Sequence, residues 1–246
     1  RVNRLQGEFF YCRAGANVRV ASWNAHRWEE PVISGTEGSG TIFFSYCTGR
    51  CMFCQNYPIS QLGSGKDISA ERLGGLMLEL QKWGCHNVNL VTPTQYVPQI
   101  LAAVESAAAR GLVIPLVYNT SGYDAPETLQ LLDGVVDVYL PDSKYADDEV
   151  AARVSGYHDY VRHNRLALLE MLRQVGPEQI LDNQGLAQRG MIVRHLVLPD
   201  QLSQTKEVLA WLAENLGTGV HVSLMSQYFP AWRAVGTPGL GRGITP

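Results

Sequence analysis

Three cysteines close together in the sequence have the spacing of a metal-binding loop. Cys47, Cys51 and Cys54 form the pattern C-x3-C-x2-C within a chain of 246 residues. A structural zinc site more often has four ligands in pairs, and no second C-x2-C or paired H-x3-H follows this loop. Three thiolates on one short loop suit a 4Fe-4S cubane whose fourth iron stays open for a substrate or cofactor. Three buried structural cysteines, or a disulfide with one free thiol, are the alternatives.

The same loop resembles the signature of the radical S-adenosylmethionine (SAM) superfamily, with Phe53 at the hydrophobic position beside the cofactors. The resemblance runs from about residue 1 to 240 and is strongest to iron–sulfur proteins similar to pyruvate formate-lyase activating enzyme, through residues 33–45, 89–94 and 139–147. It implies a 4Fe-4S cluster on the three cysteines and SAM bound to the open iron. It also implies reductive cleavage of SAM to a 5′-deoxyadenosyl radical, which takes a hydrogen atom from the substrate.

Polar residues after two predicted strands are candidates for holding SAM, because ligands of α/β folds bind outside the carboxyl ends of the strands. Thr92 and Thr94 stand where many superfamily members carry a Gly-Gly-Glu-like segment for the SAM amino group. This chain has no carboxylate there, and hydroxyls and backbone carbonyls are expected to substitute. Asn119 and Ser121 resemble a segment that contacts the ribose and methionyl part of SAM. Ordinary turns at these strand ends are the alternative reading.

Charged residues follow or interrupt two further apolar runs. Asp142 and Lys144 resemble the Asp-x-Lys of activating enzymes, which lies near the methionyl end of SAM and the substrate. A charged pair at an apolar strand end is costly unless it meets solvent, a ligand or partners. Arg194, inside an apolar strand, is expected by resemblance to pair with the SAM carboxylate. His195 faces the opposite side by strand alternation and is predicted to be a structural histidine.

Short apolar runs alternate with amphipathic stretches and must position these residues. Helices are predicted from Ser69 to residue 83, from Ser203 to residue 215, and over 95–110, 124–132 and 166–174. A hairpin insertion is expected at 176–190. The pattern predicts an α/β fold, a partial (β/α)6 TIM-like barrel, with a doubly wound open sheet as the alternative. The predicted strands are 41–46, 87–92, 113–118, 135–140, 191–198 and 220–225.

Three regions are predicted along the chain: an N-terminal extension (1–40), the radical SAM core (41–235) and a C-terminal tail (236–246). The net charge of -3 gives no reason to expect nucleic acid as a partner, and no apolar run approaches the length of a membrane span. An odd number of cysteines and no export signal favour a cytoplasmic protein. Cys12 is interpreted either as the remainder of a second metal site, as in relatives with additional N-terminal cysteines, or as an inert thiol.

The leading functional hypothesis is a radical SAM oxidoreductase that takes hydrogen from a protein glycine or a related substrate, as activating enzymes do. Flavodoxin or ferredoxin is the expected reducing partner, and Asp142 and Lys144 are the catalytic candidates. A radical SAM enzyme acting on a small metabolite is the second hypothesis. A non-catalytic iron–sulfur or zinc protein is the third.

Overall fold

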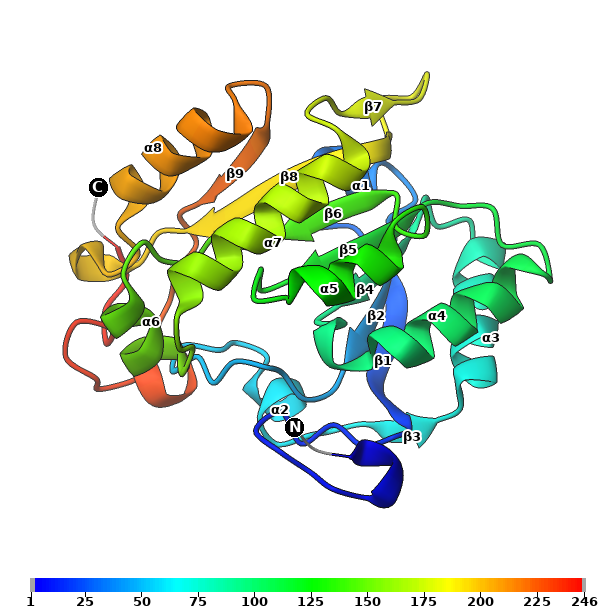
Figure 1. Ribbon diagram of the computed structural model, residues 1–246, viewed down its shortest axis with the longest axis horizontal. Helices are drawn as coiled ribbons and strands as arrows, with labels where there is room; N and C mark the ends of the chain where they lie inside the picture. Colours follow the sequence, from blue (N-terminus) through cyan, green and yellow to red (C-terminus); the bar gives the residue numbers. More distant parts are fainter. Residues whose placement is uncertain (1–2, 245–246) are drawn as a thin grey trace.

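A curved sheet forms the centre of the computed structural model, which describes residues 3–244. Six of its strands run parallel, and among the described residues the last of them pairs only with β8, so the sheet does not close. This arrangement is a partial barrel and confirms the predicted fold (Figure 1). The parallel strands are β2 (Ser39–Phe44), β4 (Val88–Val91), β5 (Leu116–Thr120), β6 (Val138–Pro141), β8 (Ala187–Leu196) and β9 (His221–Met225).

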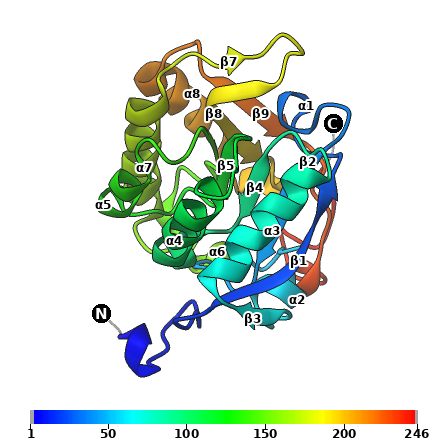
Figure 2. The same cartoon turned by 90° about the vertical axis from the view of Figure 1, so that its right-hand side faces the viewer.

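Two antiparallel strands extend the sheet beyond β2. β1 (Val18–His26) pairs with β2, and β3 (Lys66–Ile68) pairs with the other edge of β1 (Figure 2). β1 lies within the stretch predicted as an N-terminal extension, so that stretch supplies a strand to the sheet. The boundaries at residues 40 and 235 stay a prediction.

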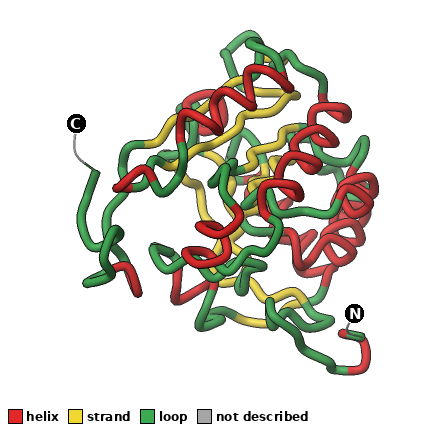
Figure 3. Tube along the Cα trace, turned by 60° about the vertical axis from the view of Figure 1, so that its left-hand side comes forward, coloured by secondary structure: helices red, strands yellow, loops and turns green. Residues whose placement is uncertain are grey.

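Helices cover the outer face of the sheet, where Figure 3 shows them in red around the yellow strands. Ser69 caps its helix as predicted, because its hydroxyl accepts a hydrogen bond from the backbone N–H of Arg72. Ser203 is not a helix cap: the hydroxyl accepts from Leu198 N instead, and the helix begins at Thr205. The covering helices are α3 (Ala70–Lys82), α4 (Val97–Ala108), α5 (Pro126–Leu129), α7 (Tyr160–Val175) and α8 (Thr205–Leu216).

Several shorter elements were not predicted, among them α6, which Asp147 caps through the backbone N–H of Val150. The strand predicted over 113–118 begins only at Leu116. Val113 and Ile114 instead donate their backbone N–H groups to the side chain of Gln81. The remaining elements are α1 (Pro31–Ser34), α2 (Tyr57–Ser60), α6 (Asp148–Ser155), β7 (Ile180–Leu181) and the 3-10 turns Arg4–Gln6, Thr94–Tyr96, Gln130–Leu132, Pro199–Gln201 and Trp232–Ala234.

The predicted hairpin insertion is confirmed. β7 pairs antiparallel with the start of β8, and Asp182 closes the turn by accepting from the backbone N–H groups of Gln184 and Leu186. Because of this pairing, β8 begins at Ala187, four residues before the predicted start at 191. None of the helices within residues 3–244 combines the length and the apolar character that crossing a bilayer requires.

The strands bury apolar side chains on both faces. Tyr118 and Val193 belong to the core that packs under the helices, whereas Val117 and Ile192 belong to a separate inner cluster. That inner cluster surrounds Ile33 of α1, whose side chain is fully buried. The short helix between β1 and β2 therefore fills part of the barrel interior, and the strands that enclose it carry polar side chains further along.

Candidate functional site

The loop that carries Cys47, Cys51 and Cys54 rests on the carboxyl end of α6. The backbone N–H of Arg50 donates to Ser155 O at 2.8 Å, and that of Met52 donates to Val154 O at 2.9 Å. Carbonyls in the last turn of a helix have no partner within the helix, so the loop satisfies two of them. The helix that the sequence pattern did not reveal thus holds the loop on both sides of Cys51.

The three loop cysteines are free, partly buried thiols. Gly49 N donates to Cys47 Sγ at 3.3 Å, and the Ser60 hydroxyl lies 3.2 Å from Cys54 Sγ. Burial, and then the neighbouring Cys51 thiol, raise the pKa of Cys47 to about 12. Adjacent thiolates in such a place require a compensating positive charge, as a metal centre supplies.

No three side chains of His, Cys, Asp or Glu within residues 3–244 are arranged to hold a single metal ion together. In a cubane each thiolate ligates a different iron, so the three sulfurs need not converge on one point. All five cysteines of the chain are free thiols, and the predicted alternative of a disulfide in the loop is not what the structure has.

An ionic group lies at the carboxyl ends of β6 and β8. Asp142 Oδ2 accepts from Lys144 Nζ at 2.5 Å, and Asp142 Oδ1 lies 3.2 Å from Arg194 Nε, an ion pair without hydrogen-bond alignment. Arg194 Nη2 donates to Asn119 Oδ1 at 2.6 Å. The side chains of Asp142, Lys144 and Arg194 are only 15%, 17% and 18% exposed. The structure thus brings together four of the predicted site residues.

Glu29 is a member of this group that the sequence did not reveal. Its carboxylate lies 3.7 Å from Arg194 Nη1, and its side chain is 12% exposed. Glu29 lies between β1 and α1, in a stretch without hydrophobic periodicity. It reaches the barrel interior because α1, which follows it, packs inside the barrel. The ion-paired charges of this group are two cations, Lys144 and Arg194, and two carboxylates, Asp142 and Glu29. Although burial lowers the pKa of Arg194, these carboxylates and that of Glu30 raise it above its ordinary value.

Mutual attraction keeps these groups ionised. Burial alone raises the pKa of Asp142, but Lys144 and Arg194 outweigh it and lower that pKa below its ordinary value. Burial lowers the pKa of Lys144, but Asp142 and then the Cys51 thiol outweigh it and raise that pKa.

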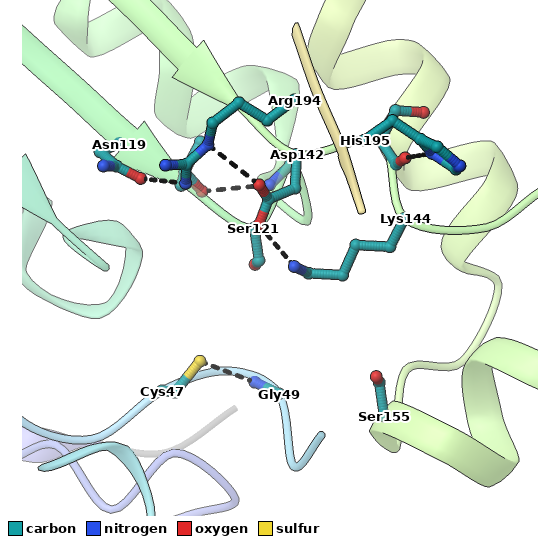
Figure 4. A network of polar contacts seen from close by, with 12 residues as sticks. Cys47, Gly49, Asn119, Ser121, Asp142, Lys144, Ser155, Arg194 and His195 are labelled. Carbon is teal, nitrogen blue, oxygen red and sulfur yellow. Dashed lines mark hydrogen bonds and ion pairs between the residues drawn. The ribbon is translucent and has the colours of Figure 1, made fainter. Parts of the chain in front are cut away.

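Two tyrosines connect the ionic group to the cysteine loop. The Tyr160 hydroxyl accepts from Lys144 N at 3.0 Å, and the Tyr160 ring lies 5.2 Å from that of Tyr157, whose hydroxyl lies against Gly49 of the loop. In Figure 4 the Lys144 side chain runs toward Asp142 and Ser121, and the segment that carries Cys47 and Gly49 lies below them in the view.

A close backbone contact fixes the strand end that carries Asp142. Gly122 has φ of 68°, and a Cβ at that position would lie 2.1 Å from the carbonyl oxygen of Asp142. Asn164 of α7 donates to both Gly122 O and Asp142 O, and the Tyr160 hydroxyl donates to Ser121 O. Only glycine permits this approach. The close contact of Gly122 therefore brings the preceding residue, the predicted Ser121, beside Asp142.

Thr92 and Thr94 follow the end of β4, and Asn119 lies on the adjacent strand β5. The Thr94 hydroxyl is 3.1 Å from that of Thr120, and Thr92 N donates to Asn119 O at 2.8 Å. Thr92 has a left-handed backbone with φ of 60°, which is uncommon for a β-branched residue and often marks a functional turn. The Gln95 amide donates to Thr92 O and Tyr46 O, and so ties this turn to the start of the cysteine loop.

Phe53 and His195 have clear packing partners. Phe53 is 9% exposed and its ring meets Tyr228 edge-on at a centroid distance of 5.8 Å. The His195 ring is fully buried between Ser143 O, 2.6 Å from Nδ1, and the Thr205 hydroxyl, 2.9 Å from Nε2. The prediction that Arg194 faces inward and His195 is a satisfied structural residue is confirmed.

The residues present fit an iron–sulfur cluster and a ligand beside it. The donor set is three free thiols on one loop, and the loop glycine Gly49 leaves the space where a Cβ would meet the Tyr157 hydroxyl at 2.2 Å. That hydroxyl is buried and has no hydrogen-bond partner among the described residues. Unpaired buried polar atoms are rare in native proteins and point to a missing group.

Comparison with known proteins decides the family. The sequence profile of the Radical SAM superfamily matches residues 41–223, most of the chain. The protein is a member of the radical SAM superfamily. Membership implies an enzyme that uses SAM and an iron–sulfur cluster, and the matched range contains the cysteine loop and the ionic group.

Three proteins similar to this radical SAM protein match between 74% and 99% of its chain. Uncharacterized protein MJ0674 of Methanocaldococcus jannaschii is 33% identical over 256 residues, which cover 99% of this chain and 68% of that protein. A crystal structure of HydG, a maturase of the FeFe-hydrogenase, superposes with a TM-score of 0.58 at 14% identity, over 85% of this chain and 48% of HydG. Native anSMEcpe with bound AdoMet gives 0.52 at 10% identity, over 74% and 49%. At these identities the two structures show the fold alone, and this chain spans about half of their length.

Proposed function

We propose that this protein binds a 4Fe-4S cluster through Cys47, Cys51 and Cys54 and cleaves SAM reductively. The observation that carries the proposal is that the cysteine loop and the Asp142–Lys144–Arg194 group, which Tyr160 and Tyr157 connect, lie close together at the carboxyl ends of the barrel strands. Ligands of such folds bind at that end. When bound, the cluster and SAM supply an electron and a 5′-deoxyadenosyl radical that takes hydrogen from the substrate.

The charged residues at the strand ends are suited to the polar ends of SAM. Arg194 and Lys144 are cations inside a mostly buried site and would hold the SAM carboxylate, since guanidinium and ammonium groups bind carboxylates strongly when water is excluded. Asp142 keeps both cations charged and oriented. Asn119 and Ser121 would contact the ribose, and Thr92 and Thr94 would contact the SAM amino group through carbonyl or hydroxyl oxygens.

Aromatic side chains would exclude water from the site. Phe53, Tyr145, Tyr160 and Tyr228 belong to one buried cluster beside the cysteine loop. A reactive radical requires such exclusion, because water access permits side reactions. Phe53 would contribute by packing in this aromatic cluster, which agrees with its hydrophobic position in the loop motif.

The expected reducing partner is flavodoxin or ferredoxin, and one cavity supports it. A pocket of about 120 Å³ reaches Cys47 and is bordered by Arg13, Arg50 and Arg233, with no carboxylate among its lining residues. Arg13 and Arg233 are exposed, and Trp232 stacks on Tyr57 at 5.7 Å beside them. Arginine and aromatic residues are enriched at protein interfaces, and a cationic rim attracts an acidic carrier.

The substrate that we propose is a protein glycine or a related group, as for glycyl-radical activating enzymes. Support comes from the open side of the barrel, where β9 leaves Val222 and Leu224 exposed next to the unpaired edge of the sheet. A small metabolite is the second candidate, favoured by the closure of the barrel interior by α1 and Glu29. A peptide containing the glycine would yield 5′-deoxyadenosine above the uncoupled rate only in the first case.

Anaerobic reconstitution with iron and sulfide, followed by dithionite and SAM, tests the proposal. We expect 5′-deoxyadenosine and methionine from the wild-type protein, and a loss of more than about 100-fold in Cys51→Ser, because a cluster ligand is removed. Cys85→Ala is the matched control, since Cys85 is buried in the core outside the loop and should leave the rate unchanged. An intact cluster without 5′-deoxyadenosine would instead indicate a non-catalytic iron–sulfur protein, and zinc uptake without a cluster would indicate a zinc protein.

A further inference from the structure

Tyr157 carries the most conspicuous unpaired polar atom in the described part of the chain near the cysteine loop. Its side chain is 1% exposed, and its hydroxyl has no hydrogen-bond partner within residues 3–244. A buried tyrosine hydroxyl normally finds a partner, and leaving one without costs about 1–3 kcal/mol. Burial raises the pKa of Tyr157, and the side chain of Ser121 is close enough to lower that pKa in part but does not meet hydrogen-bond geometry. Other tyrosines of the same cluster, such as Tyr145 and Tyr160, are hydrogen-bonded.

The position of the hydroxyl is set by the cysteine loop. A Cβ at Gly49 would lie 2.2 Å from Tyr157 Oη and 2.4 Å from Cζ, so the phenol rests against the loop between Cys47 and Cys51. Gly156, which ends α6 with φ of 66°, turns the chain so that Tyr157 points there. The glycine in the motif is therefore required by this phenol.

Neighbouring rings prevent the hydroxyl from turning away. The Tyr157 ring lies 4.7 Å from Tyr123 and 5.2 Å from Tyr160, measured between centroids. A tyrosine hydroxyl is an O–H donor at neutral pH. This one is held against the loop between Cys47 and Cys51 by its contact with Gly49.

We infer that the Tyr157 hydroxyl donates a hydrogen bond to the iron–sulfur cluster or its thiolate ligands at Cys47 and Cys51, and thereby raises the reduction potential of the cluster. The reduced cluster carries one more negative charge than the oxidised one, so a donor to its sulfurs stabilises the reduced form. This inference rests on the proposed cluster. Tyr157 is a positioning and tuning residue and does not touch the reacting atoms.

The test compares the midpoint potentials of cluster-loaded wild type, Tyr157→Phe and Tyr123→Phe in EPR-monitored redox titrations without SAM. Tyr123 belongs to the same ring stack, but its hydroxyl donates to His158 O at 2.7 Å and not toward the loop. We expect Tyr157→Phe to have a lower potential and Tyr123→Phe to match wild type. In the cluster-free protein, Tyr157→Phe should unfold at the wild-type temperature or above, because it removes an unpaired group and no protein hydrogen bond.

Equal potentials in cluster-loaded wild type and Tyr157→Phe would overturn the inference and leave the proposed function intact. So would a loss of stability in cluster-free Tyr157→Phe, since that would reveal a protein partner. If Tyr157→Phe takes up no cluster while wild type and Tyr123→Phe do, the phenol is required for loading rather than for the potential, and the inference is overturned. Failure of all three proteins to take up a cluster would overturn the proposed function together with the inference.

Discussion

The barrel interior contains two regions of opposite character on the same strands. Toward α1, Val117 and Ile192 pack around Ile33 in a fully apolar cluster. Two residues further along the same strands, Asn119 and Arg194 take part in the ionic group. Packed apolar side chains stabilise a fold, whereas a buried ion pair is often no more stable than an apolar replacement. The apolar region therefore serves stability, and we propose that the ionic region is retained for binding.

The largest difference between the regions should follow from Asp142→Asn. This change leaves Lys144 and Arg194 without their shared carboxylate, and removing one partner of a buried ion pair costs about 3 kcal/mol. We expect the free energy of unfolding to fall by about that amount and SAM cleavage to fall by about 10- to 100-fold. Denaturant titration and 5′-deoxyadenosine assays measure the two effects. Asp67→Asn is the control at an exposed site. It removes a surface ion pair with Arg19, so it should lower the free energy of unfolding by at most about 1 kcal/mol and leave SAM cleavage unchanged.

Ile33→Val tests the apolar region with the smallest possible cavity. We expect the free energy of unfolding to fall by about 1 kcal/mol, because a buried methyl group is lost, and SAM cleavage per folded molecule to remain at the wild-type rate. Denaturant titration and the SAM assay on the same samples measure both. A rate that fell in proportion to stability would show that the two regions are not separable.

His195, on the outer side of the strand that carries Arg194, should have the smallest effect on SAM cleavage. Burial lowers its pKa in the folded protein. Below the unfolded value of about 6.5, only the unfolded chain takes up the proton, so this residue lowers stability as the pH falls from about 6.5 toward its folded pKa. His195→Gln should flatten that part of the stability profile, measured by denaturant titration between pH 8 and 5. The exposed-site variant His221→Gln should keep the wild-type slope.

The parallel strands and the cysteine loop were predictable because local patterns encode them. Buried strands have apolar runs, and the spacing of Cys47, Cys51 and Cys54 is local in the sequence. Strand alternation required Arg194 and His195 to face opposite sides, and the resemblance to activating enzymes favoured Arg194 for the inner face. Ser203 was assigned wrongly as a helix cap, because its hydroxyl bonds back to Leu198 in the preceding loop rather than to the helix.

Other parts of the site depend on contacts that no local pattern encodes. Glu29 approaches Arg194 only because α1, between β1 and β2, folds into the barrel interior. Tyr157 contacts Gly49 although more than a hundred residues separate them in the sequence. The support of the cysteine loop by α6 is likewise a contact between distant segments. Such long-range packing is set by the tertiary structure, so these residues were visible in the fold and not in the sequence.

The central claim is that the loop holds a 4Fe-4S cluster with SAM bound between it and the ionic group. The EPR spectrum of the reconstituted, dithionite-reduced protein, recorded before and after addition of SAM, tests it most directly. We expect a reduced 4Fe-4S signal that changes on SAM addition in wild type and changes much less in Arg194→Met, which removes the inner guanidinium. A spectrum that SAM leaves unaltered in wild type would contradict the account.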